Sequence, residues 1–511
     1  MQRRQGQNRL HARRRKTPVR ARFTAQNYRR VRSIAPLQSI IVKTCSTKAN
    51  WRKIFRKRRN RVRAAAGDGA ILWLGHALQP RNYTNNTFPF RQNSNFLYYA
   101  GLAEPNLAII SYPEPDADIL FARQDDIDDI VWSGPGATLQ EMAHSAGIGR
   151  VEDIEKLKEA INEIHAQKRP IHYLPPYQYS SALRIARLLR IRVENVGRNA
   201  SAALMEQVVD QRCVKSTEEI SEIEDALAIT ARMHRAAMAA AKPGLRESDI
   251  AGMMQGIALS SGRGQAFEPI VTINGEVLHN NSRDNILEPG RLLLNDSGAE
   301  SPMYYASDIT RTYPVNGKFT PRQAEIYQIV LDTQLAAIGM IKPKISYMDV
   351  HLGACRVLVE GLINAGLMKG NPADAVDAGA HSLFMPHSIG HLMGLDVHDM
   401  EDLGNFLGCK KNIAKWSGPF GLNYLNLDRP LKAGFVLTVE PGIYFIPALI
   451  ERWRSEKKCQ EFINYDKLGA WLSFGGIRIE DNILVTSKGS RLLNPSIPKT
   501  IEEVEAACAR P

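Results

Sequence analysis

Two aspartates, Asp296 and Asp308, are spaced as if they serve one chemical purpose. Each closes a short apolar or aromatic run, at residues 292–294 and 304–305, and residues 297–302 between them favour a turn. We therefore predict two antiparallel strands joined by a short loop, which would bring both carboxylates to one face. Carboxylates that close repel each other unless a proton or a cation lies between them. The pair alone does not decide the matter, because an Asp often caps a turn.

A second segment with chemical potential, residues 385–399, contains three histidines separated by glycines in an apolar setting: His387, His391 and His398. A single His is usually a satisfied core or surface residue. Three of them within twelve residues indicate chemistry, because His is the commonest metal ligand and proton carrier.

Two more carboxylates follow predicted strands. Glu440 ends the β-branched run 436–439, where a charge is rarely buried unless it is paired or metal-bound. Arg478 and Glu480 are two residues apart and therefore share one face of a strand. Each acid taken alone could instead be an edge or turn charge.

Together these segments supply two Asp, one His and two Glu as candidate metal ligands: Asp296, Asp308, His391, Glu440 and Glu480. Oxygen-rich ligation with one imidazole suits hard divalent cations such as Mn²⁺ better than a thiolate zinc site does. Five such side chains, two of them bridging, can hold two metals roughly 3.5 Å apart. A metal pair of this kind generates hydroxide from a bridging water at neutral pH and polarises a carbonyl. The predicted reaction class is hydrolysis.

The elements that must position these ligands alternate between strands and helices. Ser216 and Glu219 have capping-box spacing, and the apolar residues after them mark one face of a helix, so a second, larger domain is expected to begin there. Residues 51–66 are predicted to form a basic surface helix, and the stretch that follows residue 200 resembles a linker. No internal repeat is found. Strands are expected at 70–74, 107–111, 119–122 and 171–174, and helices at 321–341 and 347–366.

The net charge of +13 belongs to the N-terminus and not to the body of the chain. Of 66 Lys and Arg, 22 lie in residues 1–67, which contain no acid, so the remaining 44 basic residues face 53 acidic ones. A nucleic-acid-binding domain needs a basic face, and none is predicted. No apolar run approaches the roughly 18 residues of a membrane helix, so no membrane partner is expected either.

The cysteines and the N-terminal leader bear on location. The six cysteines include no CxxC pair, so we predict neither a disulfide framework nor a zinc cluster, and reduced thiols indicate an intracellular protein. The Arg-rich leader, residues 1–50, lacks the composition needed to fold and is similar to an organellar transit peptide. We expect a cytoplasmic protein, or a mitochondrial matrix protein if the leader is a transit peptide; the leader could also be a disordered extension or a start-site artefact.

The motifs around the candidate ligands resemble those of the pita-bread metallopeptidases, in the branch that contains aminopeptidase P and prolidase. The match covers roughly residues 212–495, and its five motifs occur in the family order. A weaker match at residues 90–98, Phe-Arg-Gln-Asn-Ser-Asn-Phe-Leu-Tyr, resembles the N-terminal domain of aminopeptidase P. The five motifs are Asp296-Ser-Gly, Asp308-Ile-Thr-Arg-Thr, His387-Ser-Ile-Gly-His391, Thr438-Val-Glu440-Pro-Gly and Arg478-Ile-Glu480-Asp.

The resemblance implies a role for each metal ligand. Asp296 would bind one metal, and Asp308 and Glu480 would bridge both. His391 and Glu440 would bind the other metal. Glu440 would also accept the proton of the attacking water.

The resemblance also implies a substrate site next to the metals. His279, His387 and His398 would hold the scissile carbonyl, stabilise the tetrahedral intermediate and transfer protons. Arg478 matches an arginine near the metals and the substrate, whereas Arg311 is expected to be structural.

The implied fold is α/β (α+β) in two domains after the leader at 1–50. Residues 212–495 would form a pseudo-symmetric pita-bread metallopeptidase domain with a curved antiparallel sheet. Residues 51–200 would form the smaller N-terminal α/β domain, which in this family usually helps to form homodimers or homotetramers.

The implied function is that of an Xaa-Pro aminopeptidase. Such an enzyme uses two divalent ions, expected to be Mn²⁺, and hydrolyses the bond between an N-terminal residue and a following proline by attack of a bridging hydroxide. Its partners would be peptides with proline at the second position. A prolidase, which cleaves Xaa-Pro dipeptides, is the alternative, because residues 446–474 with Trp453 and Trp471 form an insertion-like stretch as in prolidases.

Three further functional assignments agree less well with the residues present. An inactive family member used as a binding module would usually have lost ligands, and all five are present. A metal-independent hydrolase on the same fold, such as creatinase, typically lacks the metal-binding acids. A methionine aminopeptidase would share the ligands but would normally lack the N-terminal domain.

Overall fold

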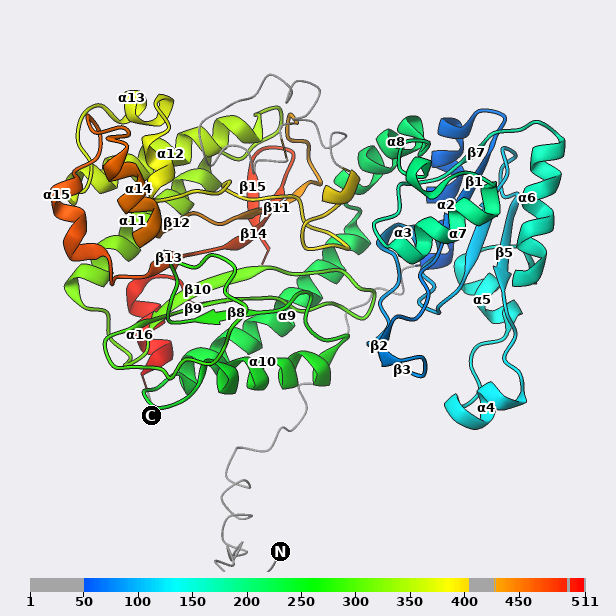
Figure 1. Cartoon of the computed structure of the whole chain (residues 1–511), viewed down its shortest axis with the longest axis horizontal. Coiled ribbons are helices and arrows are strands. Elements are labelled where there is room, and N and C mark those ends of the chain that lie inside the picture. The colour runs from blue at the N-terminus through cyan, green and yellow to red at the C-terminus, as the bar shows by residue number, and fades with distance from the viewer. Residues whose placement is uncertain (1–49, 404–426, 428, 494–496, 510–511) are drawn as a thin grey trace, which may run out of the picture. The chain divides into compact units, whose positions relative to one another are not determined.

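The computed structural model describes residues 50–403, 427, 429–493 and 497–509 (Figure 1). The expected leader therefore lies outside the described residues except for Asn50, and from Asn50 onward the chain forms one compact unit. Among the described residues, no helix combines the length and the hydropathy that a bilayer crossing requires.

The N-terminal part is built on a mixed five-stranded sheet, which confirms the predicted strands. Strand β1 pairs antiparallel with β4 and parallel with β7, and its residues are almost all buried. The strand order is β6 (Arg150–Asp153), β5 (Asp118–Ala122), β4 (Ala108–Ser111), β1 (Ala70–Leu74) and β7 (Ile171–His172). The other elements are β2 (Pro80–Tyr83), β3 (Asn86–Thr87), α3 (Ser94–Ala100), α4 (Ile127–Ser133), α5 (Leu139–Ala146), α6 (Leu157–Ala166) and α7 (Tyr179–Leu189).

The first helix, α2 (Trp51–Val62), forms where a basic surface helix was predicted, and most of its basic residues are exposed, but three arginines of this segment are buried against the prediction. Arg59 is fully buried, and Arg58 and Arg63 are nearly so. Arg59 Nε donates to one oxygen of Asp118 at 2.8 Å, and Arg63 Nη2 donates to the other at 2.6 Å. Because Asp118 begins the buried strand β5, it provides a negative charge inside the domain. The sequence of the helix alone cannot reveal this distant partner.

Replacing Asp118 by Asn is expected to lower the free energy of unfolding by about 3 kcal/mol or more, because it leaves two buried guanidiniums without a charge partner. Asp116 is the matched control, since its side chain, which binds Arg56, is 39% exposed and an exposed ion pair contributes little. Urea denaturation of the two variants measures the difference. Equal effects of Asp116→Asn and Asp118→Asn would contradict this account of the helix.

The stretch after residue 200 is a helix and not a linker. Helix α8 (Ala202–Cys213) buries apolar side chains such as Leu204 and Val208. It also buries Arg212, whose Nη2 donates to Asp399 at 2.6 Å. The charged and polar residues of this segment concealed its burial, because their partners lie far away in the sequence.

The C-terminal part begins with α9 (Thr217–Ala240), which has the predicted capping box between Ser216 and Glu219. Its sheets are antiparallel throughout the described strands: β8–β9–β10, β11–β14–β15 and β12–β13. Helices α9 and α10 lie along the β8–β10 sheet (Figure 1). The strands are β8 (Ile270–Thr272), β9 (Leu292–Ser297), β10 (Ile309–Pro314), β11 (Val436–Val439), β12 (Gly442–Tyr444), β13 (Gly476–Arg478), β14 (Asp481–Val485) and β15 (Ser490–Leu492).

Two pairs of helices repeat the same structure, in keeping with the pseudo-symmetry that the resemblance implied, although no repeat was found in the sequence. The turn between α9 and α10 (Glu247–Ser261) and the turn between α11 (Pro321–Met340) and α12 (Tyr347–Asn364) both contain Lys-Pro. Gly244 N donates to Leu287 O, and one hundred positions later Lys344 N donates to Leu431 O. Both residues have positive φ, 90° and 75°. Since the two turns share few residue types beyond Lys-Pro, the repeat is visible mainly in the backbone.

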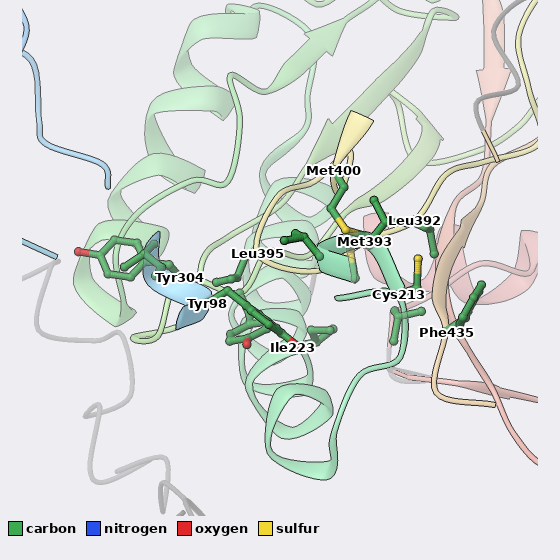
Figure 2. Close-up of a cluster of buried hydrophobic side chains, with 14 of the residues drawn as sticks. Tyr98, Cys213, Ile223, Tyr304, Leu392, Met393, Leu395, Met400 and Phe435 are labelled. Carbon is green, nitrogen blue, oxygen red and sulfur yellow. The ribbon is translucent and has the colours of Figure 1, made fainter. Parts of the chain in front are cut away.

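The predicted helices at 321–341 and 347–366 are confirmed by α11 and α12. The insertion-like stretch contains α14 (Pro447–Ser455) and α15 (Tyr465–Leu468), and it buries Trp453 and most of Trp471 against the core. One large hydrophobic cluster runs through both parts of the chain; Figure 2 shows Tyr98 of α3, Ile223 of α9 and Leu395 among its members. The remaining helices are α13 (Pro372–Asp377) and α16 (Ile501–Cys508).

Candidate metal centre

The predicted hairpin carries Asp296 and Asp308. Strands β9 and β10 pair antiparallel with Asp296 opposite Thr310. Asp308 lies just before its strand, β10, and not at the end of a strand as predicted. The aromatic residues that were expected to form that strand belong to the connecting loop, where Tyr304 has φ of 68°. Gly298 is required here, since a Cβ at this position would lie 1.8 Å from Ser307 O. The close approach of the two arms of the hairpin places both carboxylates in the interior.

The other three candidate ligands reach the same place from strand ends and from one loop. His391 Nε2 lies 3.4 Å from Asp308 Oδ2 and 3.5 Å from Glu440 Oε1. Glu440 follows β11, and Glu480 follows β13. Ligand atoms of Asp308, His391 and Glu480 all lie within 4.8 Å of one another.

Three carboxylate oxygens in this cluster are buried without a hydrogen-bond partner among the described residues: Asp296 Oδ1, Asp308 Oδ1 and Glu480 Oε1. Buried polar atoms are almost always satisfied, so three adjacent unsatisfied acceptors indicate that protons or a cation lie between them. Oxygen donors with one imidazole are the set that hard divalent cations prefer. The residues present therefore fit a divalent-metal centre.

The electrostatics of the cluster lead to the same conclusion. Burial raises the pKa of Asp296 to about 7, and the neighbouring Asp308 and Glu440 add to the rise. Burial and the same neighbours raise the pKa of Glu480 well above its ordinary value. Burial lowers the pKa of His391, but Asp308 and Glu440 reverse this and raise it to about 9. The raised pKa values mean that these groups hold protons more strongly than usual, as expected for crowded carboxylates that a bound cation would otherwise neutralise.

Arg478 links the cluster to Tyr444, a residue to which the sequence alone gave no role. Arg478 Nη2 donates to Asp296 Oδ2 at 2.6 Å, and Arg478 Nη1 donates to the Tyr444 hydroxyl at 3.0 Å. The same hydroxyl lies 2.9 Å from His387 Nε2. Because an arginine only donates, the Tyr444 O–H is free to donate to His387. His387 Nδ1 then donates to Ser388 O at 2.8 Å, so both ring nitrogens are engaged by the protein.

The two other predicted histidines lie at the exposed side of the cluster. The His398 ring stacks on that of His391 with centroids 3.7 Å apart, and its Nδ1 lies 3.0 Å from Glu401 Oε1. His279 is exposed on the turn after β8. Burial of part of the ring lowers the pKa of His279, and the charge of Arg478 lowers it further. The structure thus brings all nine predicted residues into one region, with the ligands inside and two histidines at the surface.

Supporting residues that were given no role from the sequence hold the ligands in place. Asn482 binds the backbone of Asp308 on both sides, donating to its carbonyl at 2.6 Å and accepting from its N–H at 3.2 Å. Thr438 Oγ1 accepts from the His391 N–H at 3.0 Å. Gly390 has φ of 154°, and a Cβ there would lie 2.2 Å from Thr438 O. The threonine and the asparagine stand two residues from predicted ligands, a spacing that could have indicated them.

Residues of the N-terminal part contact the loop that carries His398. Arg91 Nη2 donates to Leu395 O at 2.7 Å, and the Ser94 hydroxyl donates to Asp396. Arg212 binds Asp396 at 3.0 Å as well as the buried Asp399 at 2.6 Å. These contacts fix the position of the loop next to the metal centre.

A buried centre of four carboxylates and one imidazole, set in an α/β body, defines a metal-dependent enzyme. The model of metallopeptidase family M24 matches residues 221–487, and the model of the aminopeptidase P N-terminal domain matches residues 55–172. The chain belongs to metallopeptidase family M24.

Individual relatives and solved structures agree with this assignment. The chain is 32% identical over 486 residues to a probable Xaa-Pro aminopeptidase pepP of Emericella nidulans, covering 93% of this chain and 99% of that protein. It resembles the aminopeptidase PepP of Pseudomonas aeruginosa with a TM-score of 0.74 and 26% identity, over 89% and 98% of the two chains. A zinc-substituted E. coli aminopeptidase P in complex with product matches with a TM-score of 0.71 and 27% identity, over 89% and 98%.

Proposed function

We propose that this chain is an Xaa-Pro aminopeptidase, which hydrolyses the bond between an N-terminal residue and a following proline. The observation that carries the proposal is the convergence of the five ligand side chains, with three buried carboxylate oxygens left unsatisfied by the protein. Relatives that match nearly the whole chain and bear the name Xaa-Pro aminopeptidase support the substrate class.

The ligand side chains would hold two divalent cations, Asp296 on one, His391 and Glu440 on the other, with Asp308 and Glu480 shared. Bound cations of this kind acidify a water and polarise a carbonyl. We propose Mn²⁺ for both positions, because four carboxylates and one imidazole are a hard donor set. The zinc-substituted E. coli structure shows that a similar fold in that protein accepts zinc. The fold therefore does not select the metal, and the preference for Mn²⁺ rests on the hard donor set.

Glu440 is the carboxylate best placed to accept a proton from the attacking water. Its side chain is 18% exposed, more than that of Asp308 at 7%. It therefore reaches both the buried ligands and the accessible side of the centre. A general base must lie within hydrogen-bond reach of the proton that it takes, and a side chain at the accessible edge of the centre supports this role.

The histidines and Arg478 would position the substrate. His279 and His398 are exposed beside the centre, where they can donate to the scissile carbonyl and to the tetrahedral intermediate. His387 would act through the Tyr444 hydroxyl, since both of its ring nitrogens already have partners. Arg478 orients Asp296 and Tyr444 together.

The decisive experiment compares Xaa-Pro with Xaa-Pro-Yaa after Mn²⁺ loading. We expect metal-dependent cleavage of the tripeptide with little cleavage of the dipeptide, and no cleavage by the chelated enzyme. Preferential cleavage of the dipeptide would instead identify a prolidase, with a group that captures the substrate carboxylate. Metal binding without activity on either peptide would reject both and favour a binding module.

We further propose the domain limits 51–200 and 212–495, following a leader at 1–50. The matches to the two family models at 55–172 and 221–487 fall within these limits. A homodimer or homotetramer and a cytoplasmic location, or a mitochondrial matrix location if the leader directs import, are part of the same proposal. The free state of the described cysteines, Cys213, Cys355, Cys459 and Cys508, is consistent with either compartment.

A further inference from the structure

A second group of potential metal ligands lies in the core, apart from the carboxylate centre. His351 and Cys355 are one turn apart on α12, and His381 approaches them from the short helix Ala380–Leu383. Their ligand atoms lie within 4.8 Å of one another. All three side chains are at most 1% exposed.

Two ring nitrogens of this group have no hydrogen-bond partner in the part of the chain that the structure describes: His351 Nδ1 and His381 Nδ1, both buried. His351 Nε2 faces Cys355 Sγ at 3.5 Å, and a thiol is only a weak donor and acceptor. The unpartnered His381 Nδ1 and the weakly paired His351 Nε2 and Cys355 Sγ are costly to bury unless something binds them.

The spacing of these atoms suits a tetrahedral cation. With metal–sulfur and metal–nitrogen bonds of about 2.3 and 2.0 Å, two zinc ligands stand roughly 3.5 Å apart, as His351 Nε2 and Cys355 Sγ do. The His351 and His381 rings meet at 69° with centroids 6.2 Å apart, so they approach from different directions. Thiolate with imidazole is a softer donor set than the carboxylate centre offers and favours zinc over manganese.

We propose that His351, Cys355 and His381 form a structural Zn²⁺ site that joins α12 to the segment leading into His387. On loading, the Cys355 thiol releases its proton and the thiolate sulfur bonds to the cation. Zinc prefers four ligands, so a water molecule would complete the tetrahedron. The sequence analysis excluded a zinc cluster because no CxxC pair occurs, but a His and a Cys four residues apart on a helix share one face and supply two ligands equally well.

The zinc site would hold in place the segment that leads from His381 to His387 and the metal ligands beyond it. Residues after His381 run directly to the backbone of β12, where Tyr444 N donates to Phe384 O at 2.9 Å. On the other side, Tyr347 lies one turn before His351 on α12, and its hydroxyl donates to Thr438 O. A cation at this point would therefore connect two elements that flank the ligands His391 and Glu440.

Cobalt substitution tests the proposal, because only a thiolate ligand gives a sulfur-to-Co²⁺ charge-transfer band and the carboxylate centre has none. Chelator-stripped protein, reduced and kept free of oxygen, is titrated with Co²⁺. We expect the intensity of the saturated band to correspond to about one thiolate-bound Co²⁺ per chain in the unmodified protein and in Asp308→Asn, and the band to vanish in Cys355→Ser. Cys508→Ser, which changes another buried cysteine, should keep it. Absence of the band from the unmodified protein, or its persistence in Cys355→Ser, would overturn the site.

A second measurement needs no substitution at the cluster. Zinc X-ray absorption of protein purified without added metal should show one sulfur at about 2.3 Å and nitrogen ligands at about 2.0 Å, with about one zinc per chain that Mn²⁺ does not displace. Oxygen and nitrogen ligands alone, or copper in place of zinc, would reject the assignment. Because the proposed peptidase activity is not the readout, failure of that activity and failure of this site are separate results.

Discussion

Replacing Asp308 by Asn is expected to lower kcat by about 10³-fold or more and to lower the bound metal, while the chain remains folded. Asp308 Oδ2 lies 3.4 Å from His391 Nε2, and Oδ1 is a buried acceptor without a partner. A neutral amide neither balances a second cation nor bridges two. Metal catalysis is worth several kcal/mol of transition-state stabilisation, and each 1.4 kcal/mol is a factor of ten.

The fold should survive this substitution because the backbone of Asp308 does not depend on its carboxylate. Asn482 binds the backbone N–H and C=O of Asp308, and the β9–β10 register is held by the strands themselves. The control is Asp332→Asn, which alters an exposed carboxylate on α11 and should change neither activity nor metal content. Metal analysis, steady-state kinetics and thermal unfolding are measured on both variants. Retention of full activity by Asp308→Asn would refute the assignment of the centre.

The part of the fold that follows from local sequence could be predicted. The cap at Ser216 and Glu219 formed as expected, because a capping box involves residues three apart. The hairpin that carries Asp296 was found for the same reason: apolar runs and a turn lie within one short window. Its second strand was misplaced, because aromatic residues 304–305 read as strand although they form the loop.

The errors arise where the deciding partner is distant in sequence. Arg59 was predicted to face solvent, but Asp118, 59 positions away, makes its burial possible. Helix α8 was taken for a linker because the carboxylates that pair with its Arg212, Asp396 and Asp399, lie 184 and 187 positions away. A charged residue viewed alone predicts exposure, and only the assembled fold shows the counter-charge.

The candidate site was found because its ligand types recur in motifs, whereas the residues that hold the ligands carry no such signal. Tyr444 is one tyrosine among 16 in the sequence, and nothing local distinguishes it. Its role becomes visible only when Arg478 and His387 are seen on either side of its hydroxyl. Side chains of this kind, which orient ligands without binding the metal, are those that sequence patterns miss.

Replacing Arg478 by Lys keeps the positive charge but removes the directed hydrogen bonds of the guanidinium. The variant therefore measures how much the centre depends on these bonds. The guanidinium of Arg478 makes three bonds in different directions, to Asp296 Oδ2 at 2.6 Å, the Tyr444 hydroxyl at 3.0 Å and Thr310 Oγ1 at 3.1 Å. A lysine ammonium is a point charge that does not reproduce this fork. Groups that orient metal ligands typically contribute about 10–100-fold to metal affinity or activity, and we expect a loss of that size in kcat/KM and in Mn²⁺ affinity.

Two comparison variants separate the contacts. Tyr444→Phe removes one acceptor of Arg478 and the partner of His387 but leaves the pair with Asp296, so its Mn²⁺ affinity should stay near that of the unmodified protein while kcat falls. Arg452→Lys alters an exposed arginine whose side chain is 73% exposed and should change nothing. Isothermal titration with Mn²⁺ and steady-state kinetics give both quantities. If Arg478→Lys bound Mn²⁺ and turned over substrate as the unmodified protein does, the orientation of Asp296 by Arg478 would have no part in the function, and charge alone would suffice at this position.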